Sequence, residues 1–155
     1  MITIDEALKL VLSNLPERHV EPIDFRSALG RVLAENLVAT SDIPPFRRAA
    51  VDGYALRFED AGTAPARLAY VGEIRAGGGT SIPVGRMETV AIMTGAPVPE
   101  GADAVQMVEH SQRSGDGREV VILKPVKLGE NIAPRGAEAS IGDLVLEHGR
   151  VLGPA

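Results

Sequence analysis

The stretch Pro44–Ala55, PPFRRAAVDGYA, decides how this chain is interpreted. Two prolines and an aromatic residue precede an Asp-Gly pair, and an apolar run follows it. A second stretch of the same kind, IMTGAPVPEGADAV, occupies Ile92–Val105. Ordinary strands and turns do not require strings of this length and composition, so the two stretches together predict more than a generic fold.

The composition of the 155 residues sets the first limits. Hydrophobic residues make up 45% but aromatic residues only 3%, which predicts a core of Val, Ile, Leu and Ala in one domain or two small ones. The net charge of -5 and the lack of a basic run argue against a nucleic-acid partner. Without cysteine, disulfides and thiolate chemistry are excluded. No secretory signal or membrane-length apolar run is present, so we expect no membrane partner and a cytoplasmic location.

The N-terminal residues predict an amphipathic helix that ends before Pro16. Thr3 and Glu6 have the spacing of a capping box, in which each side chain satisfies a backbone N–H of the first turn. The apolar residues then recur at helical spacing, which requires packing against the rest of the chain or a second copy. They are Ile4, Ala7, Leu8, Val11, Leu12 and Leu15.

The remainder predicts a β-rich α+β fold. We expect a short strand at Ile23–Phe25 and one helical turn at Ser27–Leu29 before Gly30. Short strands separated by turns then favour a small barrel or sandwich. The expected strands are 67–74, 89–93, 104–109, 119–124, 143–146 and 150–152, and 37–39 is a short apolar run.

The proline-containing segment Ser41–Phe46 is the expected domain boundary. The change of texture after it suggests a β-rich inserted domain at 46–136. The insert would interrupt a discontinuous mixed α/β base domain built from 1–45 and 137–155, which contains the N-terminal helix and short strands.

Three segments carry a resemblance to a known family. Pro44–Ala55 resembles the pattern P-x-F-x-x-S-A-M-D-G-Y-A, and Asn131–Glu138 resembles N-I-R-x-R-G-E-D. Thr94–Pro97, followed by the rest of the second stretch, completes the set. The chain thus resembles, from Ile4 to Pro154, the N-terminal portion (domains I and II) of the molybdopterin molybdotransferase family, which includes MoeA and the gephyrin E region. In that family the first domain is interrupted by the second, as expected here.

The resemblance implies a transferase of molybdenum cofactor biosynthesis, which inserts molybdate into adenylylated molybdopterin with release of AMP and depends on Mg²⁺. It implies that Asp52 is catalytic and a possible magnesium ligand. Thr94, Gly95 and Arg135 would bind substrate or another anion, since amide N–H groups and a guanidinium suit oxyanions. Glu138 would contact these binding residues without contacting the substrate itself.

Each of these residues also has a structural interpretation. Asp52-Gly53 is a preferred pair for a tight turn with positive φ. Thr94 and Gly95 can simply be a strand end entering a loop, and Arg135 and Glu138 an exposed i, i+3 ion pair.

The chain also departs from the family patterns. Ala49 stands where the family usually has Ser, Val51 where it often has Met, and Ala133 where it has Arg. Ala137 and Glu138 replace a Glu-Asp pair.

The resemblance also implies partners. The family keeps its nucleotide-binding α/β domain, marked by T-G-D-E-L, in a later region, and this sequence lacks the motif. We therefore expect a fragment or stand-alone N-terminal portion. It would form a homodimer, contribute to a composite site with adenylylated molybdopterin bound on the missing domain, and show no turnover alone. The alternatives are a non-catalytic dimerisation or scaffold module and a divergent paralogue that handles tungstate.

Overall fold

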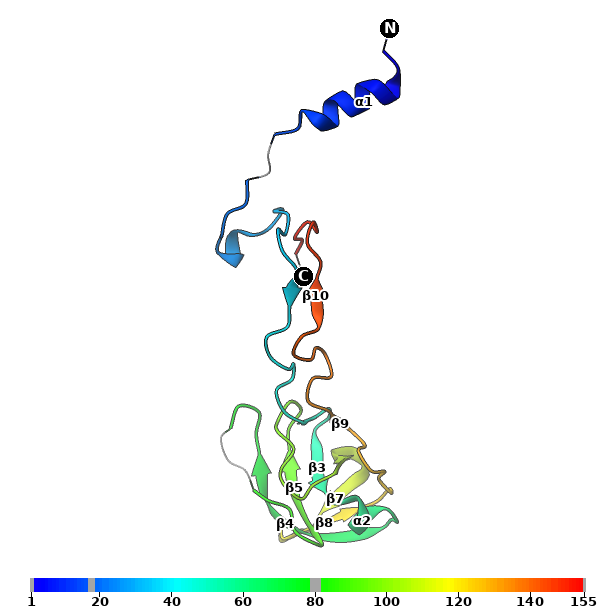
Figure 1. The fold of residues 1–155 in the computed structure, drawn as a ribbon. Helices are drawn as coiled ribbons and strands as arrows, with labels where there is room; N and C mark the ends of the chain where they lie inside the picture. Colours follow the sequence, from blue (N-terminus) through cyan, green and yellow to red (C-terminus); the bar gives the residue numbers. More distant parts are fainter. Residues whose placement is uncertain (1, 17–18, 79–81, 155) are drawn as a thin grey trace. The chain divides into compact units, whose positions relative to one another are not determined.

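The computed structural model describes residues 2–16, 19–78 and 82–154 (Figure 1). The chain divides into two compact units. The N-terminal unit comprises Met1–Leu37 and Leu146–Ala155, and the barrel unit comprises Val38–Val145. The domain limits expected at 45/46 and 136/137 stay a prediction. None of the helices in the described ranges has the length and apolar character needed to span a bilayer.

Helix α1 (Ile4–Ser13) begins as the sequence predicts. The Glu6 backbone N–H donates to Thr3 Oγ1 at 3.3 Å, and the Thr3 N–H donates to Glu6 Oε2 at 2.8 Å. Asn14 caps the other end, where its backbone N–H donates to the Val11 carbonyl. The capping box is therefore confirmed, because both of its reciprocal hydrogen bonds are present.

The apolar stripe of α1 lies exposed within the N-terminal unit. None of the helix residues is buried, and Ile4, Leu8 and Val11 expose 87%, 55% and 60% of their surface. The helix has the sequence pattern of a packed element without a packing partner in its own unit.

The rest of the N-terminal unit corrects one prediction. Phe25–Ser27 forms a 3₁₀ helix, η1, where a strand was expected at Ile23–Phe25. The Asp24 carboxylate accepts from the Arg26 N–H at 2.8 Å, and this cap favours a helical turn over extended backbone. The strand expected at 150–152 is only an isolated bridge between Val32 and Val151.

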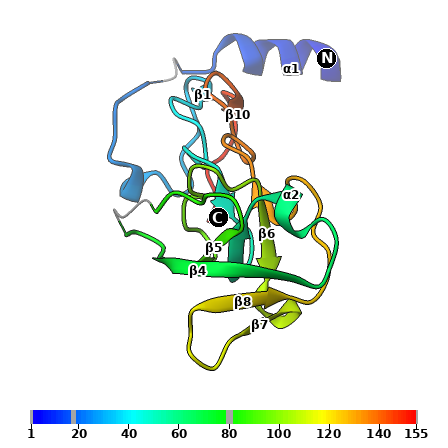
Figure 2. The same cartoon turned by 90° about the horizontal axis from the view of Figure 1, so that it is seen from below.

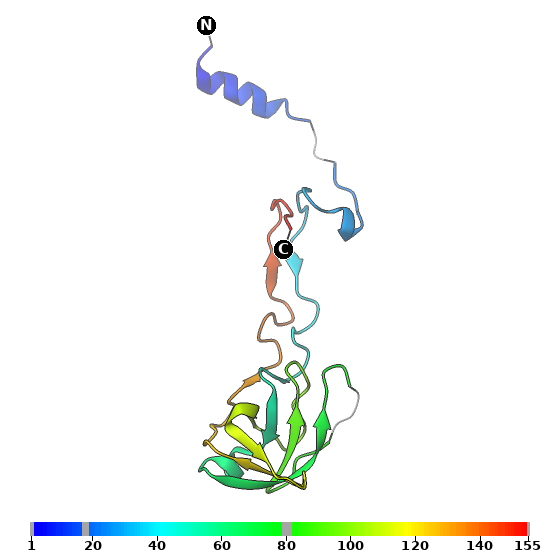
Figure 3. The same ribbon diagram turned by 180° about the vertical axis from the view of Figure 1, so that it is seen from behind.

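A six-stranded sheet forms the barrel unit, in the order β6-β3-β5-β4-β8-β7. Only the β4–β5 pair is parallel. Figures 2 and 3 show the sheet curling on itself. The β-rich, barrel-like expectation is therefore confirmed. The strands are β3 (Gly53–Leu56), β4 (Ala66–Ile74), β5 (Glu88–Ile92), β6 (Ala104–Met107), β7 (Ser111–Arg113) and β8 (Glu119–Ile122).

Shorter elements complete the fold. Two strand pairs stand apart from the main sheet: β1 (Leu37–Val38) with β10 (Leu144–Leu146), and β2 (Arg48–Ala49) with β9 (Ile132–Ala133). Helix α2 (Phe58–Ala61) and the 3₁₀ helix η2 (Val108–His110) lie between strands. The strand expected at 104–109 ends at Met107 because η2 follows.

Strand β3 lies between β6 and β5 in the sheet, and its four residues are all buried. Successive side chains of a strand point to opposite faces. Accordingly, Ala55 joins one apolar cluster with Val90 and Val105, whereas Leu56 joins the other with Ile122. The strand therefore lies between two packed layers. This packing restricts the position of Gly53, its first residue.

Gly53 is the first residue of β3 and does not lie in a positive-φ turn. A Cβ atom at this position would lie 1.9 Å from the Gln106 carbonyl oxygen on β6. Glycine is needed here for close approach of two strands, so the prediction of a tight Asp-Gly turn is wrong.

Candidate functional site

The three motif segments, far apart in sequence, meet around β2. Ala49 on β2 pairs with Ile132 on β9, and its N–H donates to the Ala96 carbonyl at 3.0 Å. The Ala50 N–H donates to the Asn131 carbonyl at 2.9 Å. The segments quoted for their unusual composition thus form one connected part of the barrel unit.

Met93–Ala96 forms the turn at the end of β5. The Ala96 N–H donates to the Met93 carbonyl at 3.0 Å, and Gly95 has a φ of +82°. This is the geometry of a type II turn, which favours glycine at its third position. The Gly95 N–H donates to the Ala49 carbonyl at 2.9 Å and so fastens the turn to β2.

One carboxylate oxygen of Asp52 accepts two hydrogen bonds from Thr94. The Thr94 N–H and its Oγ1–H each donate to Asp52 Oδ1 at 2.7 Å. Oδ2 accepts no hydrogen bond from the described residues. The Thr94 hydroxyl first, and then its backbone N–H, hold the pKa of the Asp52 carboxyl below its ordinary value. Asp52 is therefore an exposed carboxylate that is ionised at neutral pH.

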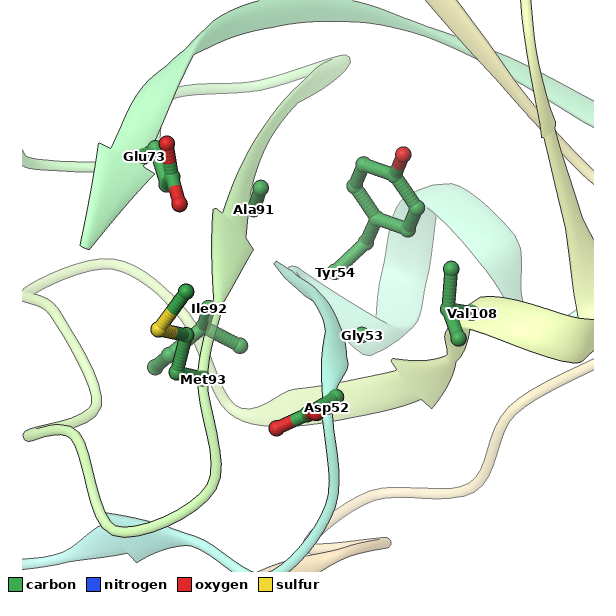
Figure 4. Close-up of a pocket in the computed structure, with 8 residues that line it drawn as sticks. All are labelled: Asp52, Gly53, Tyr54, Glu73, Ala91, Ile92, Met93 and Val108. Atoms are coloured by element: carbon green, nitrogen blue, oxygen red, sulfur yellow. The ribbon is translucent and has the colours of Figure 1, made fainter. Parts of the chain in front are cut away.

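A shallow pocket of about 260 Å³ lies beside this carboxylate (Figure 4). Asp52 stands at its edge just before β3, and Glu73 comes from β4. The Glu73 carboxylate is paired with Arg75 at 3.3 Å. The remaining lining is mostly apolar: Gly53, Tyr54, Ala91, Ile92, Met93 and Val108. The arrangement suits an uncharged or metal-neutralised group that contacts an apolar floor and one carboxylate oxygen.

Arg135 and Glu138 do not form the ion pair that was the structural interpretation. Arg135 Nε donates to Asp42 Oδ2 at 2.5 Å, and Glu138 pairs with Arg48 on β2. The Ile141 N–H first, and then Arg135, lower the pKa of Asp42. No hydrogen bond or ion pair among the described residues joins Arg135 or Glu138 to Asp52.

The donors expected to bind an anion are placed differently from expectation. Thr94 and Gly95 use both backbone N–H groups and the hydroxyl within the protein. Arg135 keeps 61% of its side chain exposed. Of these residues, the structure brings Thr94 and Gly95 to Asp52, whereas Arg135 and Glu138 lie in separate ion pairs.

Asp42 and Arg48 were not predicted as ion-pair partners, nor were Glu73, Met93 and Val108 predicted as pocket residues. No spacing rule could have found the ion pairs, because the partners are about ninety positions apart. Arg48 did lie inside the first quoted stretch, and that was the one available signal.

The described residues could supply only some of the ligands of a magnesium ion. The described residues contain no group of three or more His, Cys, Asp or Glu side chains placed to hold a metal. Magnesium, however, is usually bound by one or two carboxylates together with water and substrate phosphates. Asp52 Oδ2 supplies one oxygen of the required kind.

Comparison with known proteins identifies the family. The sequence profile described as "MoeA N-terminal region (domain I and II)" matches residues 2–155. The molybdopterin molybdenumtransferase of Staphylococcus aureus (strain MSSA476) is 36% identical over 157 residues, which cover 99% of this chain and 37% of that protein. The Staphylococcus epidermidis protein of the same name (strain ATCC 12228 / FDA PCI 1200) is 36% identical and covers 96% of this chain and 36% of its own length.

Among solved structures, the molybdopterin biosynthesis moeA protein from Pyrococcus horikoshii OT3 has a TM-score of 0.87 and 42% identity, covering 97% of this chain and 40% of that one. The chain therefore spans about two fifths of the length of the relatives it matches. On the profile match and these identities, the chain belongs to the MoeA N-terminal family and corresponds to its domains I and II.

Proposed function

We propose that this chain is the N-terminal portion of a molybdopterin molybdotransferase, which inserts molybdate into adenylylated molybdopterin with release of AMP. The names of its relatives and its membership of their family support this reaction. Within the chain, the supporting observation is the Asp52 carboxylate, fixed through one oxygen and open at the other beside a pocket.

In this proposal Asp52 Oδ2 holds Mg²⁺ at the edge of the pocket. When bound, the ion neutralises phosphate charge and polarises the phosphate oxygens. The chain's own residues do the rest: Thr94 fixes the carboxylate, Gly95 fastens the turn that carries Thr94 to Ala49, and Tyr54 and Met93 supply apolar surface. Arg135, 61% exposed and paired with Asp42 through Nε, would bind an oxyanion through its terminal N–H groups.

The size of the pocket supports a composite site. Pockets that bury a small ligand usually enclose about 300–1,000 Å³. The pocket beside Asp52 is smaller than this and open to solvent, so a pterin nucleotide would have to be covered by a further segment. We propose that a homodimer supplies it, since the exposed apolar stripe of α1 needs a packing partner.

The experiment uses a chimaera in which this chain replaces the matching region of the Staphylococcus aureus protein. With adenylylated molybdopterin, Mg²⁺ and molybdate, the chimaera should release AMP and form the cofactor, whereas the 155-residue chain alone should not. Asp52→Ala should lower the chimaera's turnover about 100-fold or more, the effect of removing a group that acts on transition-state charge.

Asp116→Ala is the matched control. Asp116 also accepts from a hydroxyl, of Ser114 at 2.6 Å, and from a backbone N–H, of Arg118 at 3.1 Å, but it lies in the turn between β7 and β8. Its removal should leave turnover unchanged. Efficient cofactor formation by the chain alone would overturn the composite site.

A scaffold role is the second candidate. Arg135 and Glu138 are both engaged in ion pairs that fasten segment 135–138 to Asp42 and Arg48, as expected of structural residues. Full activity of the Asp52→Ala chimaera would favour the scaffold over the catalytic role.

A further inference from the structure

The hydrogen bonds of Thr94 converge on a single atom. A side-chain hydroxyl and a backbone N–H from the same residue both donate to Asp52 Oδ1. One such bond would leave the carboxylate able to swing about the shared atom. Two donors in different directions restrict its torsion angles, so the position of the second oxygen is restricted as well.

The donors themselves are held by the backbone. Gly95 donates to the Ala49 carbonyl, and Ala49 in turn donates to the Ala96 carbonyl. These two hydrogen bonds fasten the turn to β2 on the C-terminal side of Thr94. On the Asp52 side, the close approach of Gly53 to Gln106 fixes where β3 starts. Asp52 and Thr94 are therefore presented to each other from two anchored segments, although 42 positions separate them.

Direct anion binding by Thr94 conflicts with this arrangement. Its two donors already serve an ionised carboxylate, and charge-assisted hydrogen bonds of this kind are stronger than neutral ones. An oxyanion that took these donors would leave Asp52 unsatisfied and place two negative charges side by side.

We propose that Thr94 is a positioning residue, which holds one carboxylate oxygen of Asp52 so that the other is presented at a fixed place to the metal-bound substrate. The catalytic meaning of this role rests on the proposed function, whereas the positioning itself is a property of the chain. It differs from the expectation that Thr94 contacts the anion, which stays a prediction.

The first test measures the Asp52 side chain in the 155-residue chain by NMR, from its Hα–Hβ couplings and its carboxyl ¹³C titration. The natural chain and Thr94→Ser, which keeps the hydroxyl, should show one Asp52 rotamer. Thr94→Val, which removes the hydroxyl, should show averaged rotamers and an Asp52 pKa closer to its ordinary value. Thr63→Val is the matched control, because no described residue hydrogen-bonds the exposed Thr63 hydroxyl.

Two outcomes of this measurement would overturn the proposal: a single Asp52 rotamer in Thr94→Val, or averaging in Thr94→Ser equal to that in Thr94→Val. Thr94 is exposed, so both variants should keep the barrel folded, and the Gly53 and Gln106 amide signals report this. If valine does disturb the fold, Thr94→Ala removes the same hydroxyl with a smaller side chain.

The second test carries the variants into the chimaera. Thr94→Val should lower kcat about 10- to 100-fold, as the loss of a group supporting a metal ligand does, with KM less affected. Thr94→Ser should restore kcat. Loss of activity in Thr94→Val with an unchanged Asp52 rotamer would mean that Thr94 contacts the substrate, against the proposal. Full activity of Asp52→Ala would instead defeat the proposed function, while the NMR result would still decide whether Thr94 holds Asp52.

Discussion

The two units of this chain contain similar apolar residues, which are buried in one unit and exposed in the other. In the barrel unit, Leu56, Leu68 and Ile122 are almost completely buried. In the N-terminal unit, Leu8, Val11 and Leu12 expose more than half of their surface, and no described residue is buried. The barrel unit has a hydrophobic core of its own, whereas the apolar side chains of the N-terminal unit are exposed and could form a core only with a partner.

This contrast separates two sources of order. The barrel unit is stabilised by burial, which contributes roughly 25 cal/mol for each Å² of apolar surface. Helix α1 is stabilised locally, by its capping box and first-turn acidic residues. A short helix of this kind is marginal alone, so its stripe is the part of the chain most dependent on a partner.

Truncation of the barrel core should have the largest effect. Ile122→Ala should lower the free energy of unfolding of the barrel unit by about 2–5 kcal/mol, because Ile122 is fully buried and leaves a cavity. Leu12→Ala, at 58% exposure, should change it by less than about 0.5 kcal/mol. Urea unfolding followed by tyrosine fluorescence measures both, and equal losses would erase the contrast.

A glycine substitution should come next. Gly53→Ala would put a methyl group against the Gln106 carbonyl oxygen, and relieving the clash should cost about 1–3 kcal/mol. Gly115→Ala, where a Cβ would meet open space, is its control. A Gly53→Ala chain as stable as the control would show that β3 and β6 lie further apart than described.

In α1, the change to make is Thr3→Ala. It removes the capping hydroxyl and should destabilise the helix by about 1 kcal/mol. Far-ultraviolet circular dichroism should show less helix, while the urea midpoint of the barrel unit stays constant. A shifted midpoint would mean that the two units unfold together.

The loss of stability at acid pH should differ between the two units, with a smaller effect than the substitutions above. The pKa of Asp42 is lowered by the Ile141 N–H and by Arg135, and the pKa of Glu6 is lowered by the backbone and the hydroxyl of Thr3. A lowered folded pKa gives stability that is present above the unfolded pKa, about 3.9 for Asp and 4.3 for Glu, and is lost as pH falls through the folded value.

Asp42→Asn should therefore flatten the acid limb of barrel unfolding, and Glu6→Gln should flatten that of helix content. Stability curves from pH 7 down to acid would test both. If each variant altered both limbs, the assignment of one carboxyl to each unit would be wrong.

The local features of the fold were predictable from the sequence. The capping box of α1 and the strands β4, β5, β6 and β8 follow from spacing and alternation within a few residues. Only two residues each form β2 and β9, which are too short to show a period. At Phe25–Ser27 the Asp24 side chain caps a 3₁₀ helix, so the strand predicted from the apolar pattern did not form.

The candidate site was predictable only in part. The unusual stretches pointed to Asp52, Thr94 and Gly95, which the structure brings together. The partners of Arg135 and Glu138 could not be predicted, because chain reversal through the whole barrel unit brings Asp42 and Arg48 to them. The reason for Gly53 also lay outside the sequence, since the carbonyl that excludes a side chain belongs to β6.

The strand order has a consequence for synthesis on the ribosome. Strand β3 pairs with β5 on one side and β6 on the other, and both are translated after it. A nascent chain therefore carries Gly53–Leu56 unpaired until Ile92 has left the exit tunnel and paired on one side only until Met107 has left it, and β4 waits for Ile122 on its outer edge. Folding of this unit is thus a late event of translation, and the apolar residues of β3 stay accessible to a ribosome-bound chaperone until the partner strands emerge.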